Sequence, residues 1–421
     1  MLDLKFIREH TDRVRKGTRD KNEPDAVDQL LELDATRRKL IGEVEKLKHE
    51  KNVASQAISE AKKAGADAVA AIAEMRAVSE RTQALDTELR DVETQIRDRQ
   101  LRIPNIPHGD VPVGDESANR EVRSWGEPPS FAFTPAPHWE LGEKLGIFDG
   151  TAAANISGTG FTVLRGAGAR LQRALINFML DHQTINGYVE HRVPYLVTPR
   201  AMQGTGQLPK LAEDMYRIDA DDLFLIPTAE VPLTNLSAET IIPEASLPRR
   251  MVAYTPCFRR EAGAHGKDTR GMMRVHQFDK VELVKIVAPE TSDDELEALT
   301  ADAEAILQAL KLPYRVRLLA TGDLSFAAAR CYDLEAYAAG VDAWLEVSSC
   351  STFTDFQARR MDLRVRPQGS GKPYFPHTLN GSGVALPRTM IAIWENYQTE
   401  KGTIRIPDVL VPYMDGMTEI T

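Results

Sequence analysis

Apolar side chains recur at alternating steps of three and four residues between positions 28 and 103, where glycine and proline are almost absent. This spacing is typical of a coiled-coil seam, because it keeps one apolar stripe turned toward a partner helix. The predicted seam of the first limb comprises Leu30, Leu33, Leu40, Val44, Leu47, Ala54, Ile58 and Ala61. That of the second limb comprises Ala71, Met75, Val78, Leu85, Leu89, Val92, Ile96 and Ile103, with Thr82 and Arg99 at the remaining seam positions. The link KKAGAD between them, with Gly65 as the expected turn, predicts an antiparallel helical hairpin.

A limb of about 36 residues would be roughly 54 Å long. Such an arm buries only its own seam, so most of its surface must face water or a partner. Several basic side chains lie toward the turn, namely Lys46, Lys48, Lys51, Lys62, Lys63, Arg76 and Arg81. Taken alone, this mixed-charge outer face favours an ordinary solvated coiled coil.

The segment IPNIPHGDVPVGD at 103–115 holds three prolines and two glycines, which end the second limb and mark a domain boundary. We therefore predict an N-terminal domain at 1–103, a Pro-rich linker at 104–115 and a second domain at 116–421. In that domain β-like runs at 161–165, 188–194, 223–227, 251–260 and 273–287 alternate with helical patterns at 169–183 and 292–310. Many turn signals and few long crossover helices favour an α+β fold with a mainly antiparallel sheet.

The composition, with 42% hydrophobic and 27% charged residues in a chain of 421, indicates a globular protein with more than one domain. The sequence has no apolar run long enough for a membrane span and no secretory signal at its start, so a cytoplasmic location is expected, without a membrane partner. The three cysteines form no C-x-x-C pair and are expected to be reduced and buried. A net charge of -10 argues against non-specific coating of DNA or RNA, so an RNA partner would have to meet a restricted basic patch.

Residues 255–282 read as two strands joined by a loop that contains Gly263, Gly266, Lys267, Asp268, Arg270 and Gly271. The two-residue period puts Arg259 and Glu261 on one face of the first strand. It puts Arg274, His276, Phe278, Lys280 and Glu282 on one face of the second. A sheet would not bury so many charges without a ligand, although an exposed salt-bridge network is the alternative. These residue types suit a nucleotide polyphosphate and a small zwitterion.

A second glycine-rich cluster, NGSGVALPRTM at 380–390, lets a backbone pass close to a ligand before a helix begins near Pro387. The run Phe258-Arg259-Arg260-Glu261 and the stretch from Gly381 to Arg388 together resemble two signature motifs of the class II aminoacyl-tRNA synthetases. The stretches at 204–210, 227–235 and 345–360 narrow the resemblance to the seryl-tRNA synthetase family, and the resemblance covers the whole chain. In this class a further motif, here the helix from Leu171 and the strand ending at Pro194, builds a homodimer interface.

The resemblance implies that Arg259 and Arg388 are the catalytic residues, holding the α-phosphate with the serine carboxylate and the γ-phosphate of ATP. It implies that Phe278 stacks on adenine and that Glu261 contacts its exocyclic amine. The implied ATP site is completed by Arg260, Arg274, Val275, Val347 and Ser348. Glu346 and Ser349 resemble the ligands of a catalytic Mg²⁺. Since a regular strand would turn those two to opposite faces, a bulge or a strand end is predicted there.

For the serine substrate, the resemblance assigns the ammonium group to Thr228, Ala229 and Glu230, and the hydroxyl group to Glu282 and Ser382. The two-residue period of a strand would place Thr228 and Glu230 on one face. An exposed strand edge is the alternative interpretation.

The implied reaction joins L-serine to ATP and then to the 3′ end of tRNA(Ser), and it leaves open whether tRNA(Sec) is a second substrate. Only 33 residues follow Arg388, too few for a C-terminal anticodon-binding domain, so the arm is expected to hold the tRNA by shape. One rival is an amino acid:carrier-protein ligase, which would lack the arm. Another is a non-catalytic coiled-coil adaptor, which would not need Arg259, Glu282 and Arg388.

Overall fold

The computed structural model describes residues 1–65, 67, 69–262 and 270–421. The chain forms two compact units, one of residues 2–19 and 23–104 and the other of residues 105–421 with Met1 and 20–22. The predicted loop residues Gly263, Gly266, Lys267 and Asp268 lie outside the described part. Within that part, no helix has both the length and the apolar character that a bilayer span requires.

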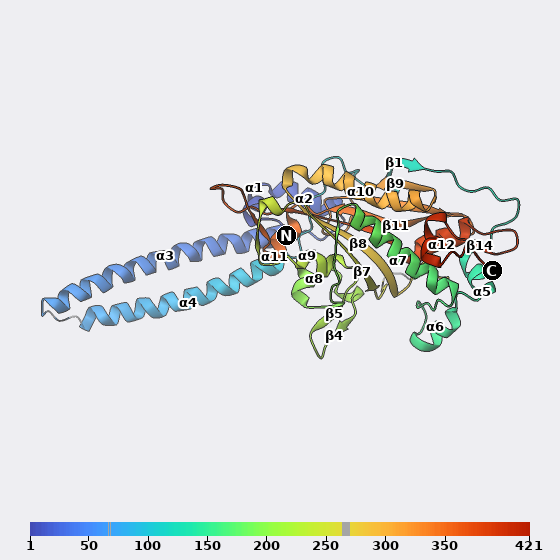
Figure 1. Ribbon diagram of the computed structural model, residues 1–421. Helices are drawn as coiled ribbons and strands as arrows, with labels where there is room; N and C mark the ends of the chain where they lie inside the picture. The colour runs from blue at the N-terminus through green and yellow to red at the C-terminus, as the bar shows by residue number, and fades with distance from the viewer. Residues whose placement is uncertain (66, 68, 263–269) are drawn as a thin grey trace. The chain divides into compact units, whose positions relative to one another are not determined.

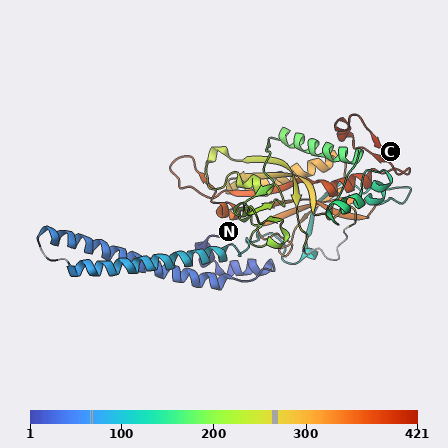
Figure 2. The ribbon, with the colours of Figure 1, turned by 90° about the horizontal axis from the view of Figure 1, so that it is seen from below.

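The first unit is a long helical hairpin preceded by two short helices. Its helices are α1 (Leu4–Glu9), α2 (Thr11–Asp20), α3 (Val27–Lys63) and α4 (Val69–Gln100). Figures 1 and 2 show α3 and α4 running side by side over their whole length. The 37 residues of α3 span about 55 Å. Gly65 lies in the turn with φ of +73°, a conformation that glycine adopts without strain, so the predicted hairpin and its turn are confirmed.

The seam between α3 and α4 follows the predicted pattern near the base of the hairpin. Leu40, Val44 and Val92 are buried there. Arg99, however, is exposed and Gln100 is buried instead, so the predicted seam position of Arg99 is wrong. The reason is local: α4 ends at Gln100, whose side-chain amide donates to the Leu2 carbonyl, so the last turn follows that contact rather than the seam.

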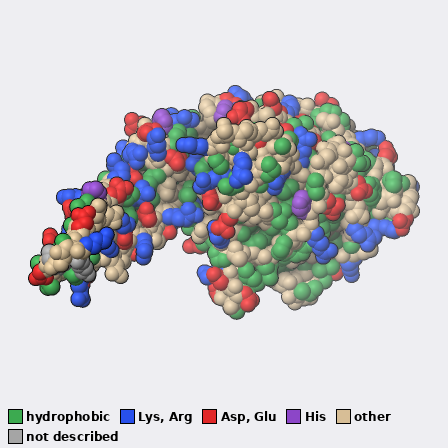
Figure 3. All heavy atoms as spheres, turned by 60° about the vertical axis from the view of Figure 1, so that its left-hand side comes forward, with side chains coloured by type: hydrophobic (Ala, Val, Ile, Leu, Met, Phe, Trp, Pro, Cys, Tyr) green, Lys and Arg blue, Asp and Glu red, His purple; other side chains and the backbone are tan. Residues whose placement is uncertain are grey.

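Charged side chains of both signs cover the outer face of the hairpin (Figure 3). Among the described residues, α3 and α4 are joined by ion pairs of Arg37 with Glu93 at 3.0 Å and of Lys48 with Asp86 at 3.2 Å. Exposed pairs of this kind contribute about 0.2–1 kcal/mol each, so burial of the seam dominates stability. The pairs mark which residues of α3 and α4 lie at the same level.

The second unit is an α+β domain. Its helices are α5 (His138–Lys144), α6 (Gly150–Ser157), α7 (Ala167–Ile185), α8 (Pro199–Thr205), α9 (Glu230–Asn235), α10 (Ser292–Ala309), α11 (Phe356–Met361) and α12 (Leu386–Asn396). Its strands are β1 (Arg120–Trp125), β2 (Val189–Glu190), β3 (Leu196–Val197), β4 (Arg217–Ile218), β5 (Leu223–Leu225), β6 (Ile241–Pro243), β7 (Arg249–Phe258), β8 (Gln277–Val287), β9 (Tyr314–Leu318), β10 (Arg330–Ala338), β11 (Ala343–Thr352), β12 (Arg364–Arg366), β13 (His377–Ala385), β14 (Ile404–Arg405) and β15 (Glu419–Ile420).

Eight strands form the main sheet in the order β1-β9-β10-β11-β13-β8-β7-β2. All neighbours are antiparallel except β2 and β7, which confirms the predicted mainly antiparallel sheet. The predicted run at 161–165 is not a strand, since among the described residues it contributes only an isolated bridge between Leu164 and Phe148.

The two faces of the sheet are covered by different helices. Odd-numbered residues of β8, such as Val281 and Leu283, pack in the core that includes α7, α10 and α12. Even-numbered residues, such as Val284 and Ile286, pack in a second core with Ala358 and Met361 of α11. Because side chains alternate along a strand, the even positions nearer the start of β8 point to the same face as α11. That face carries the candidate site.

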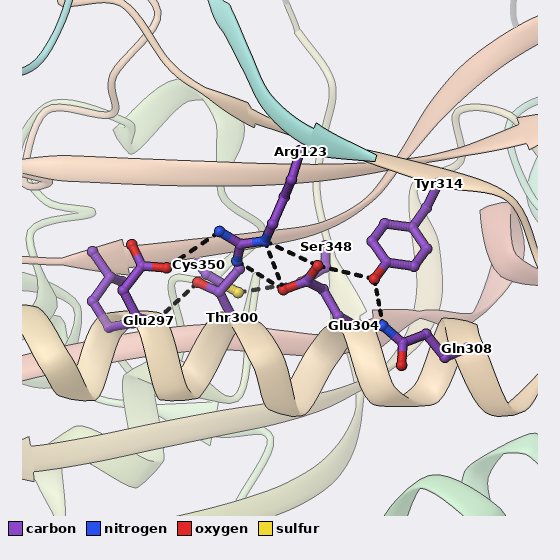
Figure 4. Close-up of polar contacts among 9 residues, drawn as sticks. Arg123, Glu297, Thr300, Glu304, Gln308, Tyr314, Ser348 and Cys350 are labelled. Atoms are coloured by element: carbon purple, nitrogen blue, oxygen red, sulfur yellow. Dashed lines mark hydrogen bonds and ion pairs between the residues drawn. The ribbon is translucent and has the colours of Figure 1, made fainter. Parts of the chain in front are cut away.

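Helix α10 is attached to the sheet by a polar network as well as by apolar contacts (Figure 4). Arg123 of β1 donates to Glu304 of α10 at 2.7 Å. The Tyr314 hydroxyl donates to the other carboxylate oxygen of Glu304 at 2.9 Å. Since the side chain of Glu304 is almost buried, this pairing offsets the cost of removing its charge from water. The network holds the layer that supports the strands of the site.

Candidate active site

A cavity of about 640 Å³ opens on the α11 side of the sheet. Most of the predicted site residues line it, namely Thr228, Glu230, Arg259, Glu261, Arg274, Val275, Phe278, Glu346, Val347, Ser348, Ser349, Ser382 and Arg388. Three others, Ala229, Arg260 and Glu282, are outside the lining that the structure describes. Residues from β8, β11 and β13, together with Arg259 and Glu261 that follow the end of β7, thus meet in one hollow although they lie far apart in the sequence.

The hairpin of β7 and β8 supplies the wall with Arg259 and Phe278. The guanidinium carbon of Arg259 lies 5.1 Å from the centre of the Phe278 ring. Its Nε donates to the Pro227 carbonyl at 3.4 Å. A cation and an aromatic face at this distance form a surface that can take a planar base beside an anion.

Arg259 and Glu261 were predicted to share one face of a strand. This prediction is wrong, because neither residue belongs to a strand. Strand β7 ends at Phe258, and Glu261 has a left-handed φ of +50°. Arg274 and His276 likewise precede β8. The chain leaves the sheet ladder at this point, so alternation no longer fixes side-chain direction. Glu261 reaches the site instead by pairing with Arg274 across the base of the loop.

Arg260 and Ala229 have surroundings unlike those of a ligand contact. The Arg260 guanidinium donates to the Glu213 carbonyl at 3.1 Å and its side chain is exposed. Ala229 is completely buried in the core formed with α11.

A buried polar cluster closes the inner end of the cavity. Lys280 Nζ donates to the Thr228 hydroxyl at 2.9 Å and lies 2.5 Å from a carboxylate oxygen of Glu282. The other carboxylate oxygen of Glu282 accepts from Asn380 at 2.6 Å. Ser382 lies directly opposite Glu282 in the register of β13 and β8. Glu282 therefore stands behind the lining and is held by residues that form it.

Glu230 forms the acidic side of this inner end. It is the first residue of α9, so the predicted strand geometry for Thr228 and Glu230 is wrong. The Thr228 hydroxyl accepts from the Glu230 backbone N–H at 3.2 Å, and this turn brings both side chains to the cavity. They are buried rather than at an exposed edge. Burial, and then the Glu282 carboxylate, raise the pKa of Glu230 to about 7.

Arg388 and Glu346 meet at the other end of the cavity. Arg388 donates to the carbonyl and the carboxylate of Glu346 at 2.8 and 3.2 Å, and to the Met273 carbonyl at 3.3 Å. Between β10 and β11 the register shifts by one residue, so Val347 is the extra residue of a β-bulge. The bulge lets Glu346 and Ser349, three positions apart, both line the cavity. The predicted bulge is confirmed.

Two residues near the inner end were missed in the sequence. Asn380 lies two positions before Ser382 on β13, so the strand period could have placed it on the same face. Gln357 comes from α11, donates to Glu230 at 2.6 Å and accepts from Thr378 at 2.6 Å. No sequence signal links α11 to this strand, because only the packing of that helix brings them together.

The cysteines behave as predicted. All three, Cys257, Cys331 and Cys350, are free and buried. Burial raises the pKa of the Cys257 thiol, which lies beside the cavity, so it is held as an unreactive thiol.

Both parts of the chain match known families. Residues 215–397 match the family described as tRNA synthetase class II core domain (G, H, P, S and T). Residues 1–107 match the family described as seryl-tRNA synthetase N-terminal domain. The serine–tRNA ligase of Thermomicrobium roseum is 55% identical over 422 residues, which cover 100% of this chain and 95% of that protein. The chain belongs to the seryl-tRNA synthetase family. A second member, the serine–tRNA ligase of Desulfosudis oleivorans, is 51% identical, with both chains covered completely.

Solved structures of the family share the fold. The seryl-tRNA synthetase from Pyrococcus horikoshii, crystallised with ATP, superposes with a TM-score of 0.95 at 37% identity, covering 100% of this chain and 99% of that one. The cytoplasmic serine–tRNA ligase from Naegleria fowleri, solved with AMP, gives a TM-score of 0.88 at 32% identity, covering 100% and 99%. Prolyl-tRNA synthetase from Giardia lamblia, at 13% identity, shares only the fold of 67% of the chain.

Proposed function

We propose that the cavity joins L-serine to ATP and that the seryl group then passes to the 3′ end of tRNA(Ser). One observation supports this proposal above the others. The cavity has a buried acidic end, at Glu230 and Glu282, and also brings together Arg259, Phe278 and Arg388. A zwitterion and a polyphosphate need this division of charge.

Serine would occupy the inner end. Its ammonium group suits Glu230 and the Thr228 hydroxyl, because two carboxylates and one lysine leave a net negative charge there. Its carboxylate suits Arg259, and its hydroxyl suits Ser382 and the Glu282 carboxylate. An alanine side chain would leave these buried groups unpaired, which is the physical basis for rejecting it.

ATP would lie with its base on Phe278 and its γ-phosphate at Arg388. A carboxylate oxygen of serine attacks the α-phosphorus, the bond from that phosphorus to the bridging oxygen breaks, and pyrophosphate leaves. Arg259 and Arg388 neutralise the charge that develops on the phosphate oxygens, so the side chains act by alignment and electrostatics rather than as a base. A ribose hydroxyl of the tRNA then attacks the seryl carbonyl carbon and AMP leaves.

Glu346 and Ser349 fit Mg²⁺. Their donors are oxygens, and within the described residues no group of three or more His, Cys, Asp and Glu side chains could hold a metal alone. Mg²⁺ commonly takes one or two protein oxygens and completes its shell with phosphates and water. When bound, the ion would supply neutralising charge on the phosphates.

The N-terminal domain, predicted at 1–103 and joined by the linker at 104–115 to the catalytic domain at 116–421, would hold the tRNA. A hairpin of about 55 Å with basic groups near its turn suits an RNA helix read by shape and backbone. Helix α7 and strand β2 would form the homodimer interface, and tRNA(Sec) is a second tRNA to be tested.

The test is ATP–pyrophosphate exchange with each amino acid in turn, followed by charging of total tRNA. Exchange that depends on serine, with charging of tRNA(Ser), is expected. Exchange with no amino acid would contradict the proposal in favour of a non-catalytic adaptor. Exchange without charging would favour loading of a carrier protein.

A further inference from the structure

Helix α5 makes a contact with the ATP-binding hairpin that none of the proposed substrate contacts requires. His138, the first residue of α5, is 1% exposed. Its Nε2 accepts a hydrogen bond from the backbone N–H of Met272 at 3.1 Å. Met272 is buried and lines the cavity, three residues after the part of the loop that lies outside the described residues.

Glu395 fixes the orientation of the imidazole. His138 Nδ1 lies 2.8 Å from Glu395 Oε1, which also accepts from the His138 backbone N–H at 2.8 Å. The second oxygen of Glu395 accepts from the N–H groups of Gly340 and Val341 at 2.8 and 3.0 Å. A carboxylate can only accept hydrogen bonds, so the proton of the contact with Glu395 lies on Nδ1. Nε2 then carries no proton and can accept from Met272. The contact with Met272 thus depends on a single tautomer.

The segment after this contact carries the ATP site. The Met273 carbonyl accepts from Arg388, and Arg274 pairs with Glu261. On the other side of Met272, the guanidinium carbon of Arg270 lies 4.6 Å from the centre of the Trp139 ring, which follows His138 in α5. Two neighbouring residues of α5, His138 and Trp139, therefore contact residues 270–272 just before β8.

Arg388 and Glu395 belong to the same helix, α12. The chain of contacts runs from Glu395 to His138, then to Met272 and Met273, and returns to α12 at Arg388. This closed circuit fixes the distance between the hairpin and the helix that would hold opposite ends of the nucleotide. Alignment within about 1 Å is what such a reaction needs.

We propose that His138, oriented by Glu395, is a positioning residue for ATP, holding residues 270–274 in the conformation that binds the nucleotide. The inference rests on the proposed function, because it concerns the same cavity. It assigns a role to side chains that lie behind the cavity and touch no substrate.

Two substitutions at position 138 separate the two contacts. In His138→Asn the side-chain amide can replace Nδ1 and keep Glu395 paired, but it cannot reach the Met272 N–H. In His138→Gln the amide oxygen can replace Nε2 as the acceptor. We expect His138→Asn to raise the KM for ATP in pyrophosphate exchange about tenfold, with the KM for serine and the melting temperature nearly unchanged. His138→Gln should restore most of the loss.

A glycine pair tests the contact from the loop side. Gly271 has φ of +63°, and a Cβ there would lie 2.2 Å from His138 Nε2. Gly271→Ala should therefore give the same ATP-selective rise, even if the variants at 138 fail to fold. Gly369→Ala is the control, since Gly369 has φ of +93° with no atom within 4 Å of an added Cβ.

An unchanged KM for ATP in both His138→Asn and Gly271→Ala would overturn the inference. So would equal rises for ATP and serine that follow a fall in melting temperature, because these would mark a purely structural contact. Absence of serine-dependent exchange in the wild-type protein would instead overturn the proposed function, so the two failures are distinguishable.

Discussion

Lys280 and Glu282 form an ion pair inside the protein, with Nζ and a carboxylate oxygen 2.5 Å apart and side chains only 6% and 0% exposed. A buried pair repays its desolvation only when the remaining donors and acceptors are also satisfied. Thr228 accepts from the lysine and Asn380 donates to the glutamate. The pair therefore holds a rigid carboxylate at the end of the proposed serine site.

Glu282→Ala is expected to have two effects. It leaves Lys280 as a buried charge without its carboxylate, so the free energy of unfolding in a denaturant titration should fall by about 3–5 kcal/mol. It also removes the proposed hydroxyl acceptor, so the KM for serine should rise far more than the KM for ATP.

The double variant Glu282→Ala/Lys280→Met separates these effects, because it removes the unpaired charge. The free energy of unfolding should largely return to the wild-type value, whereas the KM for serine should stay high. Equal losses of serine and ATP affinity in Glu282→Ala would contradict the proposed role.

Serine activation should depend on the ionisation of Glu230. The raised pKa of about 7 means that this carboxyl is protonated below neutral pH and cannot pair with an ammonium group. We expect kcat/KM for serine in pyrophosphate exchange to fall about tenfold between pH 8 and pH 6. A flat profile across this range would contradict the assignment.

Glu230→Gln should be more stable and less active. Because folding raises this pKa from 4.5 to about 7, the free energy of unfolding falls as the pH rises from about 4.5 to 7, and the full cost is present above pH 7. A neutral glutamine can still accept from Gln357, so the free energy of unfolding at pH 8 should rise by on the order of 1–3 kcal/mol. Serine-dependent exchange should be lost. A lower free energy of unfolding for Glu230→Gln at pH 8 would contradict this prediction, because it would mean that the ionised carboxylate stabilises the fold.

Arg388→Ala should reduce pyrophosphate exchange by about 10²–10³-fold, since it removes a cation proposed to neutralise phosphate charge. The control is Arg364→Ala on β12, an arginine that also pairs with a carboxylate, that of Asp362, but is more exposed than Arg388, 45% against 29%. The control should leave exchange within about twofold of the wild-type rate. Similar losses in both variants would remove the case for a specific role of Arg388.

A shortened arm tests the partner. Lys48 and Asp86 pair across the hairpin, so residues 49–85 can be replaced by a short glycine-rich turn with little strain on the base. We expect unchanged serine-dependent exchange and a loss of kcat/KM for tRNA of about 100-fold, on the order of 3 kcal/mol. Charging that survives this deletion would show that the tRNA is held elsewhere.

Periodicity alone determined the local parts of this protein. Apolar steps of three and four residues predicted the hairpin of α3 and α4, because this spacing gives each helix one apolar stripe. The two-residue period placed Phe278, Lys280 and Glu282 on one face of β8, because a regular strand alternates whatever surrounds it. The family resemblance, rather than the period, assigned Glu346 and Ser349 to one ligand, and the strand period then required a bulge or a strand end; the structure has a bulge, at Val347.

Tertiary structure decided what happens where regular elements end or meet. Glu261 and Glu230 reach the cavity from a left-handed turn and a helix start, where the strand period no longer applies. Gln357 and His138 act through residues more than 100 positions away, and only packing of α11 and α5 brings them there. Such contacts depend on the cooperative closing of the core, whereas the seam and the strand faces depend on local geometry that the sequence determines directly.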